Sequence, residues 1–140
     1  AGYFGISQHT TRAELQRAVF EGLAFAIVDS LQGYPQGGEL YLTGGGAASA
    51  TWLQIIADCT GRTVVSSPFN ELSARGAAIL AARSVDALTR HPALEQTRYR
   101  PNPQAHSRYV ALYPVYRLLR EQMLPVWQAR REALQHISQE

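Results

Sequence analysis

Three consecutive glycines, Gly44, Gly45 and Gly46, form the strongest candidate for a ligand site in the sequence. They stand between an expected short strand over residues 39–43 and a helical pattern that starts at Ser49. Glycines at such a junction let the backbone turn tightly and approach a ligand without an intervening Cβ. The helix that follows presents unpaired N–H groups and the positive end of its dipole, which suit a phosphate or the polar edge of a ring. A tight turn without any ligand is the alternative, and the pattern alone leaves it open.

The same glycines match a dinucleotide-binding turn poorly. Gly44 and Gly46 fit the first half of that fingerprint, but Ser49 stands where the third glycine is expected. The acidic residue expected about 20 residues further on, at the end of the next strand, is missing from residues 64–67. The sequence therefore argues against a redox enzyme that uses a dinucleotide.

Other catalytic groups in the sequence lack the spacing that chemistry needs. The histidines lie far apart, which favours structural or surface roles over metal binding; they are His9, His91, His106 and His136. Cys59 lies on an apolar helix face and is expected to pack as a small hydrophobic group. Its neighbour Asp58 is expected to be a charge on the helix surface. All 13 basic residues are arginine, which excludes mechanisms that need a lysine.

The composition is that of one ordinary globular domain, with 140 residues, 46% hydrophobic and 17% charged, and a net charge of +2. The arginines are scattered, so no basic face for a nucleic acid is expected. The sequence has no run of about 18 apolar residues and no signal-peptide pattern at its start, so we expect no membrane span. These features favour a cytoplasmic protein.

The segments around the glycines alternate between helix and strand. Thr11 and Glu14 form a capping-box pattern, which begins a helix that lasts to about residue 31. Apolar spacing predicts further helices over residues 49–60 and 71–83 and strands over residues 39–43 and 62–65. This order predicts an α/β fold with a parallel pair of strands. Because two strands alone make a poor sheet, we expect the sheet to be incomplete.

The last third of the chain begins with a stretch that has no regular pattern. Residues 89–104 carry three prolines and no periodicity, which predicts a linker. An aromatic stripe at helical spacing follows and predicts a helical arm over residues 105–140 that lies back on the domain. Pro114 and Pro125 are expected to kink or divide this helix. The stripe is typical of core packing rather than of a cofactor site.

Four segments, in order and in register, resemble the FGGY carbohydrate kinases, and the xylulokinase-like members in particular. Residues 9–25 look like that family's HTRAELxRAVxEGxAF helix, and residues 42–58 look like its LTGGGAxSxxWxQxxAD adenosine motif. Residues 71–82 are similar to its ExxAxGAAxLAA helix, and residues 109–127 are similar to its tyrosine-rich closing helix. The resemblance covers nearly the whole chain.

The resemblance implies the C-terminal portion of a ribonuclease H-like (actin-like ATPase) kinase domain with a C-terminal helical arm. Residues 1–88 would be the C-terminal half of the second FGGY domain, residues 89–104 a linker and residues 105–140 the arm. In that fold, further strands, the catalytic aspartate, the phosphate loops and the sugar-binding domain precede this portion. This would account for the incomplete sheet.

The resemblance also implies an ATP-dependent kinase, with Mg²⁺, that phosphorylates an alcohol group of a pentulose or related carbohydrate. Of the family's functional residues, only those that bind the adenosine of ATP have counterparts in this sequence. These expected cofactor-binding residues are Thr43, Gly44, Gly45, Gly46, Ala47 and Ser49. Ser49 is the side chain expected to hydrogen-bond the nucleotide. No catalytic or metal-binding residue is carried over. The chain alone is therefore expected to bind ATP or ADP but not to phosphorylate a sugar, whose contacts would lie upstream.

A non-catalytic, self-associating interaction module is the alternative. In the isolated chain the strand over residues 39–43 would have a bare edge, and bare edges invite pairing with another chain. We therefore expect a dimer or higher oligomer.

Overall fold

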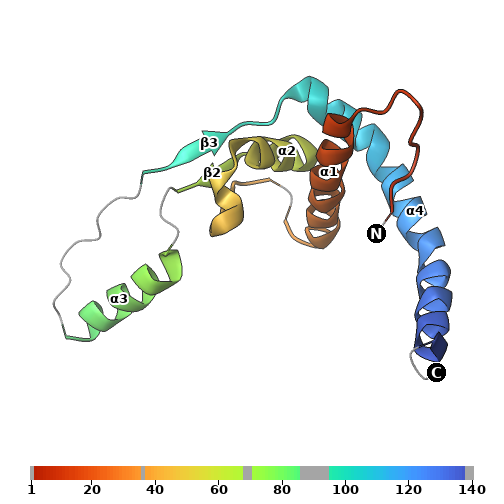
Figure 1. The fold of residues 1–140 in the computed structure, drawn as a ribbon. Coiled ribbons are helices and arrows are strands. Elements are labelled where there is room, and N and C mark those ends of the chain that lie inside the picture. Colours follow the sequence, from red (N-terminus) through yellow and green to blue (C-terminus); the bar gives the residue numbers. More distant parts are fainter. Residues whose placement is uncertain (1, 36, 68–70, 86–94, 138–140) are drawn as a thin grey trace.

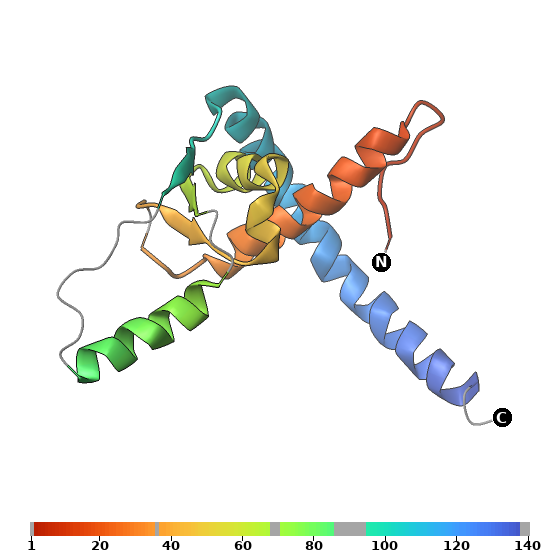
Figure 2. The ribbon, with the colours of Figure 1, turned by 60° about the vertical axis from the view of Figure 1, so that its left-hand side comes forward.

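The computed structural model describes residues 2–35, 37–67, 71–85 and 95–137. The elements, in chain order, are α1 (Arg12–Ser30), β1 (Leu40–Leu42), the 3-10 helix η1 (Gly45–Ala48), α2 (Ala50–Thr60), β2 (Val64–Ser66), α3 (Leu72–Ser84), β3 (Thr97–Tyr99) and α4 (Pro103–Ile137). The small sheet, α1, α2 and the first turns of α4 lie together, whereas α3 and the last turns of α4 project away from them (Figures 1 and 2).

The sheet has three strands in the order β1-β2-β3. β1 and β2 are parallel, with Leu40 opposite Val64, which confirms the predicted parallel pair and the α/β alternation. β3 runs antiparallel to β2, with Tyr99 opposite Val64. This third strand lies in the stretch that was predicted to be an irregular linker, and α4 begins before residue 105. The division of the chain into three regions stays a prediction.

The predicted start of α1 and both predicted ends of α2 agree closely with the structure because each rests on a specific cap. Thr11 begins α1 with a complete capping box, in which its side chain accepts the Glu14 N–H and the Glu14 carboxylate accepts the Thr11 N–H. Gly61 ends α2 in the left-handed conformation, with φ 67°.

α2 forms the centre of the core, since six of its eleven residues are buried. On one side, Leu53 and Ile56 pack against Val64 of the sheet. On another side, Ile55 and Cys59 join a cluster with α1 and α4. The prediction that Cys59 packs as a small hydrophobic group is confirmed.

The first half of α4 packs on α1 through its tyrosines. The rings of Tyr109, Tyr113 and Tyr116 lie around Phe25, with ring centroids 5.9, 5.8 and 5.2 Å from it. The tyrosines of the first half of the stripe therefore belong to the core, as predicted. The last turns of α4 project away from the domain, and Val126 and Trp127 are 53% and 36% exposed, so the prediction that the whole arm lies back on the domain is wrong for its second half (Figure 1).

Pro114 and Pro125 lie inside one continuous α4, so the predicted division of this helix is wrong. Each proline removes one N–H from the helix ladder, which leaves the carbonyl four residues earlier without its usual partner. For Pro114 that residue is Val110, which is 56% exposed, so water can satisfy the freed carbonyl. The helix bends along its length, which agrees with the other predicted possibility, a kinked helix (Figure 1). None of the described helices combines the length and apolarity that crossing a lipid bilayer requires.

Candidate functional site

The glycine turn connects the end of β1 to the start of α2 through a single turn of 3-10 helix. Gly44 has φ 86° and ψ −172°, a conformation that side-chain-bearing residues rarely adopt. Its carbonyl accepts the N–H of Ala47 at 2.9 Å, which closes the turn. The conformation at Gly44 therefore requires glycine for a reason that is independent of any ligand.

Gly45 and Gly46 leave the backbone of the turn open. Both are exposed, and a Cβ built on Gly45 would meet nothing within 4 Å. A Cβ on Gly46 would lie 3.6 Å from Nε1 of Trp52, which is an ordinary van der Waals contact. These two glycines are not required by packing inside the described fold. Their absent side chains leave room for a ligand to lie against the backbone.

Ser49 has a structural role of its own as the N-cap of α2. Its Oγ accepts the N–H of Trp52 at 3.3 Å, which satisfies one of the unpaired donors at the start of the helix. The hydroxyl hydrogen remains available as a donor, and Ser49 is exposed. Ser49 can therefore cap the helix and donate to a ligand at the same time.

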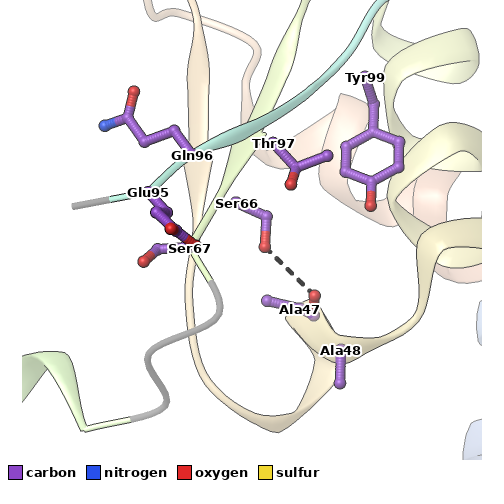
Figure 3. A pocket seen from close by; sticks show the side chains of 8 residues that line it. All are labelled: Ala47, Ala48, Ser66, Ser67, Glu95, Gln96, Thr97 and Tyr99. Carbon is purple, nitrogen blue, oxygen red and sulfur yellow. Dashed lines mark hydrogen bonds between the residues drawn. The ribbon is translucent and has the colours of Figure 1, made fainter.

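A cavity of about 690 Å³ lies beside the turn, between η1, the end of β2 and the start of β3. It is lined by Ala47, Ala48, Ser66, Ser67, Glu95, Gln96, Thr97 and Tyr99 (Figure 3). It opens at the carboxyl ends of the parallel strands β1 and β2, which is where open α/β sheets bind their ligands.

Of the six predicted site residues, only Ala47 lines this cavity. Its carbonyl accepts the Ser66 hydroxyl at 3.2 Å, which ties the turn to β2 (Figure 3). Thr43 is exposed just after β1, and the remaining four residues lie along the turn and at the cap of α2. Sequence reasoning missed the residues of β3 because it recognised no strand there.

Asp58 is buried, with 6% of its surface exposed, so the prediction of a surface charge is wrong. Its Oδ1 accepts the Gln54 side-chain amide at 2.8 Å and the Asn102 backbone N–H at 2.7 Å. These bonds compensate the burial of the carboxylate, and they lie near the end of α2 that is remote from the glycine turn.

The histidines have the structural or surface roles that their spacing predicted, where the structure describes them. His106 donates from Nδ1 to the Asp58 carbonyl at 2.8 Å, and His9 is exposed. His91 and the side chain of His136 lie outside the described residues. Among the described residues, no three His, Cys, Asp or Glu side chains gather as ligands for a metal.

A model of the C-terminal domain of the FGGY family of carbohydrate kinases matches residues 1–85. A probable L-xylulose kinase of Pasteurella multocida is 32% identical over 124 residues, which cover 85% of this chain and 26% of that protein. The chain thus spans about a quarter of the length of that relative.

Solved structures agree with the family match. The xylulose kinase of Rhodospirillum rubrum superposes with a TM-score of 0.76 at 27% identity, covering 91% of this chain and 28% of that one. A ligand-bound xylulose kinase of Lactobacillus acidophilus superposes with a TM-score of 0.77 at 21% identity, covering 87% of this chain and 27% of that one. At this identity the likeness shows the fold alone. The predicted fold, a C-terminal portion of an actin-like ATPase kinase domain, is confirmed. The chain belongs to the FGGY family of carbohydrate kinases, of which it contains the C-terminal domain.

Proposed function

We propose that this chain is the adenosine-binding part of an ATP-dependent kinase that phosphorylates an alcohol group of a pentulose or related carbohydrate. The family and the xylulose kinases among its relatives support this substrate class. The observation that carries the nucleotide role is the turn from Gly44 to Ser49. Two exposed glycines there open the backbone between the end of a parallel strand and the start of a helix.

Each residue of the turn has a distinct part in the proposed site. Thr43 and Gly44 set the direction in which the chain leaves β1. The backbone of Gly45, Gly46 and Ala47 lies against the adenine or the ribose, and the Ser49 hydroxyl donates a hydrogen bond to it. The chain thus orients the nucleotide.

In the proposed reaction a sugar hydroxyl oxygen attacks the γ-phosphorus of ATP, ADP leaves, and a carboxylate base takes the hydroxyl proton. When bound with ATP, Mg²⁺ neutralises charge on the phosphates. The described residues offer no carboxylate cluster that fits this ion, so we assign no residue of the chain to it. We likewise place the base, the phosphate loops and the sugar site outside the chain and expect the chain alone to be inactive. An ATP-dependent kinase of this kind would work in the cytoplasm.

Binding of ADP to the 140-residue chain tests the nucleotide role. We expect ADP to raise the midpoint of thermal unfolding, because anything that binds only the folded state stabilises it. Gly45→Val should weaken ADP binding at least tenfold by filling the open space in front of the backbone. Gly76→Val, which places the same side chain in open space on α3, is the matched control. Failure of ADP to bind, or equal binding to Gly45→Val, would overturn the assignment.

The coding sequence upstream of Ala1 tests the enzymatic role. An open frame with the phosphate loops and a catalytic aspartate would be expressed and assayed for ADP release with D-xylulose, L-xylulose and glycerol as acceptors. ADP release with a pentulose would support the substrate class. A stop codon immediately upstream would overturn the enzymatic role.

A stop codon immediately upstream of Ala1 would favour the alternative function, a self-associating interaction module. One observation supports it: among the described residues, β1 pairs only with β2, so its other edge carries no strand. We propose that the isolated chain associates through this edge, with a second copy as the partner.

A further inference from the structure

We propose that β3 forms the second wall of the nucleoside site, opposite the glycine turn, with Gln96, Thr97 and Tyr99 contacting the base and the ribose. This inference rests on the proposed nucleotide function and extends it to residues outside the glycine motif. It starts from the cavity, whose volume of about 690 Å³ falls in the range of small-molecule sites, roughly 300–1,000 Å³. The cavity meets the turn at Ala47 and Ala48 and meets β3 at its other side (Figure 3).

The alternation of side chains along β3 separates cavity-facing residues from the others. Thr97 and Tyr99 line the cavity and point toward η1 (Figure 3). Arg98, between them, points to the opposite face, as expected for a strand, and its Nε donates to Oε1 of Glu39 at 3.1 Å. The strand therefore presents the hydroxyl groups of Thr97 and Tyr99 to the cavity, while the charged side chain of Arg98 lies on the other face.

These cavity-facing groups have hydrogen-bonding capacity that the described residues do not use. Within the described part of the chain, the hydroxyls of Thr97 and Tyr99 have no hydrogen-bond partner. The Gln96 side chain accepts from Arg98 at 3.1 Å, and its amide N–H groups donate to none of the described residues. A hydroxyl can donate and accept, and an amide N–H donates, so together they suit the hydroxyls of a ribose and the polar edge of a base.

Tyr99 is also held in place before any ligand arrives. Its ring packs against the cluster formed by Leu53, Ile56, Ala57 and Val64. The chain just after it is fixed too, because the Arg100 carbonyl accepts the Gln54 amide at 2.8 Å.

Gln54, which holds this end of β3, belongs to α2, the helix that follows the glycine turn. One helix therefore positions both walls of the cavity, the turn at its N-terminus and β3 along its side. Such pre-organisation lowers the cost of binding, since the side chains need not be ordered by the ligand.

The test uses adenosine and ADP as probes, with binding to the 140-residue chain measured by calorimetry and stability measured by urea unfolding. Thr97→Val and Tyr99→Phe each remove one hydroxyl and keep the shape. We expect each to weaken adenosine and ADP by roughly three- to tenfold, the effect of one lost hydrogen bond. Neither hydroxyl has a partner among the described residues, so the urea midpoint of unfolding of each variant should equal that of the unaltered chain. Arg98→Met, on the opposite face of the same strand, is the matched control and should leave the affinities for adenosine and ADP unchanged.

The outcomes separate this inference from the function on which it rests. If ADP binds and Gly45→Val weakens it, but Thr97→Val and Tyr99→Phe do not, the β3 wall is overturned and the nucleotide role stands. If both hydroxyl variants lower the urea midpoint of unfolding as well as the affinity, they act through the fold, and the inference is again overturned. If the unaltered chain binds no ADP, the proposed function fails and the inference fails with it.

Discussion

Asp58, near the end of α2, accepts the backbone N–H of Asn102 at 2.7 Å and so fixes the residue that precedes α4. The same carboxylate oxygen accepts the Gln54 amide, and Gln54 also donates to the Arg100 carbonyl. Two of these bonds join residues more than forty positions apart in the sequence, and both start from the same face of α2, where Gln54 and Asp58 lie four residues apart. They define a polar clamp, made of Gln54, Asp58, Arg100 and Asn102, that attaches the junction between β3 and α4 to α2.

Asp58→Ala should destabilise the chain through this clamp. The substitution leaves the Asn102 N–H without its charged acceptor, and hydrogen bonds to charged groups contribute about 1.5–3 kcal/mol. We expect a loss of that size in the free energy of unfolding, measured with urea, and a smaller loss for Asp58→Asn, which keeps an acceptor oxygen. Glu121→Ala breaks an exposed ion pair with Arg117 and should change stability by less than about 0.5 kcal/mol. Equal stability of Asp58→Ala and the unaltered chain would contradict the clamp.

Gly61→Ala should be destabilising for two reasons that can be separated. Gly61 has φ 67°, which costs a non-glycine residue about 1–2 kcal/mol, and its new Cβ would lie 2.6 Å from Cε1 of His106. His106→Ala removes the ring, so Gly61→Ala should cost less in that background than in the unaltered chain. Urea unfolding of the two single variants and the double variant measures the difference. A cost that is the same in both backgrounds would show that the ring moves aside freely.

The capping residues and Gly61 explain why the helix boundaries were predictable, since each acts through its immediate neighbours. The start of α1 and both ends of α2 lie where these caps predict them. The resemblance to the FGGY kinases extended this to the fold class, because its motifs lie on those same helices and on the turn between β1 and α2.

β3 and the burial of Asp58 were not predictable from local pattern. β3 has three residues, too few for an alternation to be recognised, and its formation depends on pairing with β2. Asp58 is buried because Asn102 and His106 cover it, and both come from a distant part of the chain. The candidate site was therefore predicted only at its glycine wall, and the wall that β3 supplies required the structure.

Alkaline pH should destabilise the chain through two buried groups. Burial, with smaller contributions from the Glu21 and Asp58 charges, raises the pKa of Cys59 from 9.0 to about 12. Burial, with a hydrogen bond to Glu21, raises the pKa of Tyr109 from 10.0 to about 12. Both groups ionise more readily in the unfolded chain, so their contribution is complete below pH 9 and is lost as the pH rises toward 12.

Urea unfolding across that pH range measures the effect. Tyr109→Phe removes one of the two groups, so the stability of this variant should fall less steeply with pH. Tyr34→Phe changes an exposed tyrosine and should leave the pH dependence as it is in the unaltered chain. A flat profile from pH 9 to 12 in the unaltered chain would mean that neither group is protected by burial.

The open edge of β1 leads to the last prediction, which concerns self-association. The N–H of Leu40 donates to the Thr63 carbonyl at 2.8 Å, so the N–H of the next residue, Tyr41, points away from β2 toward the open edge. Tyr41→Pro removes that outward N–H without removing a bond of the β1–β2 ladder. We expect the unaltered chain to sediment as a dimer or larger species and Tyr41→Pro to shift toward the monomer. Tyr41→Val loses the same ring but keeps the N–H and should still associate. A monomeric unaltered chain, or equal association of the proline variant, would rule out this edge as the interface.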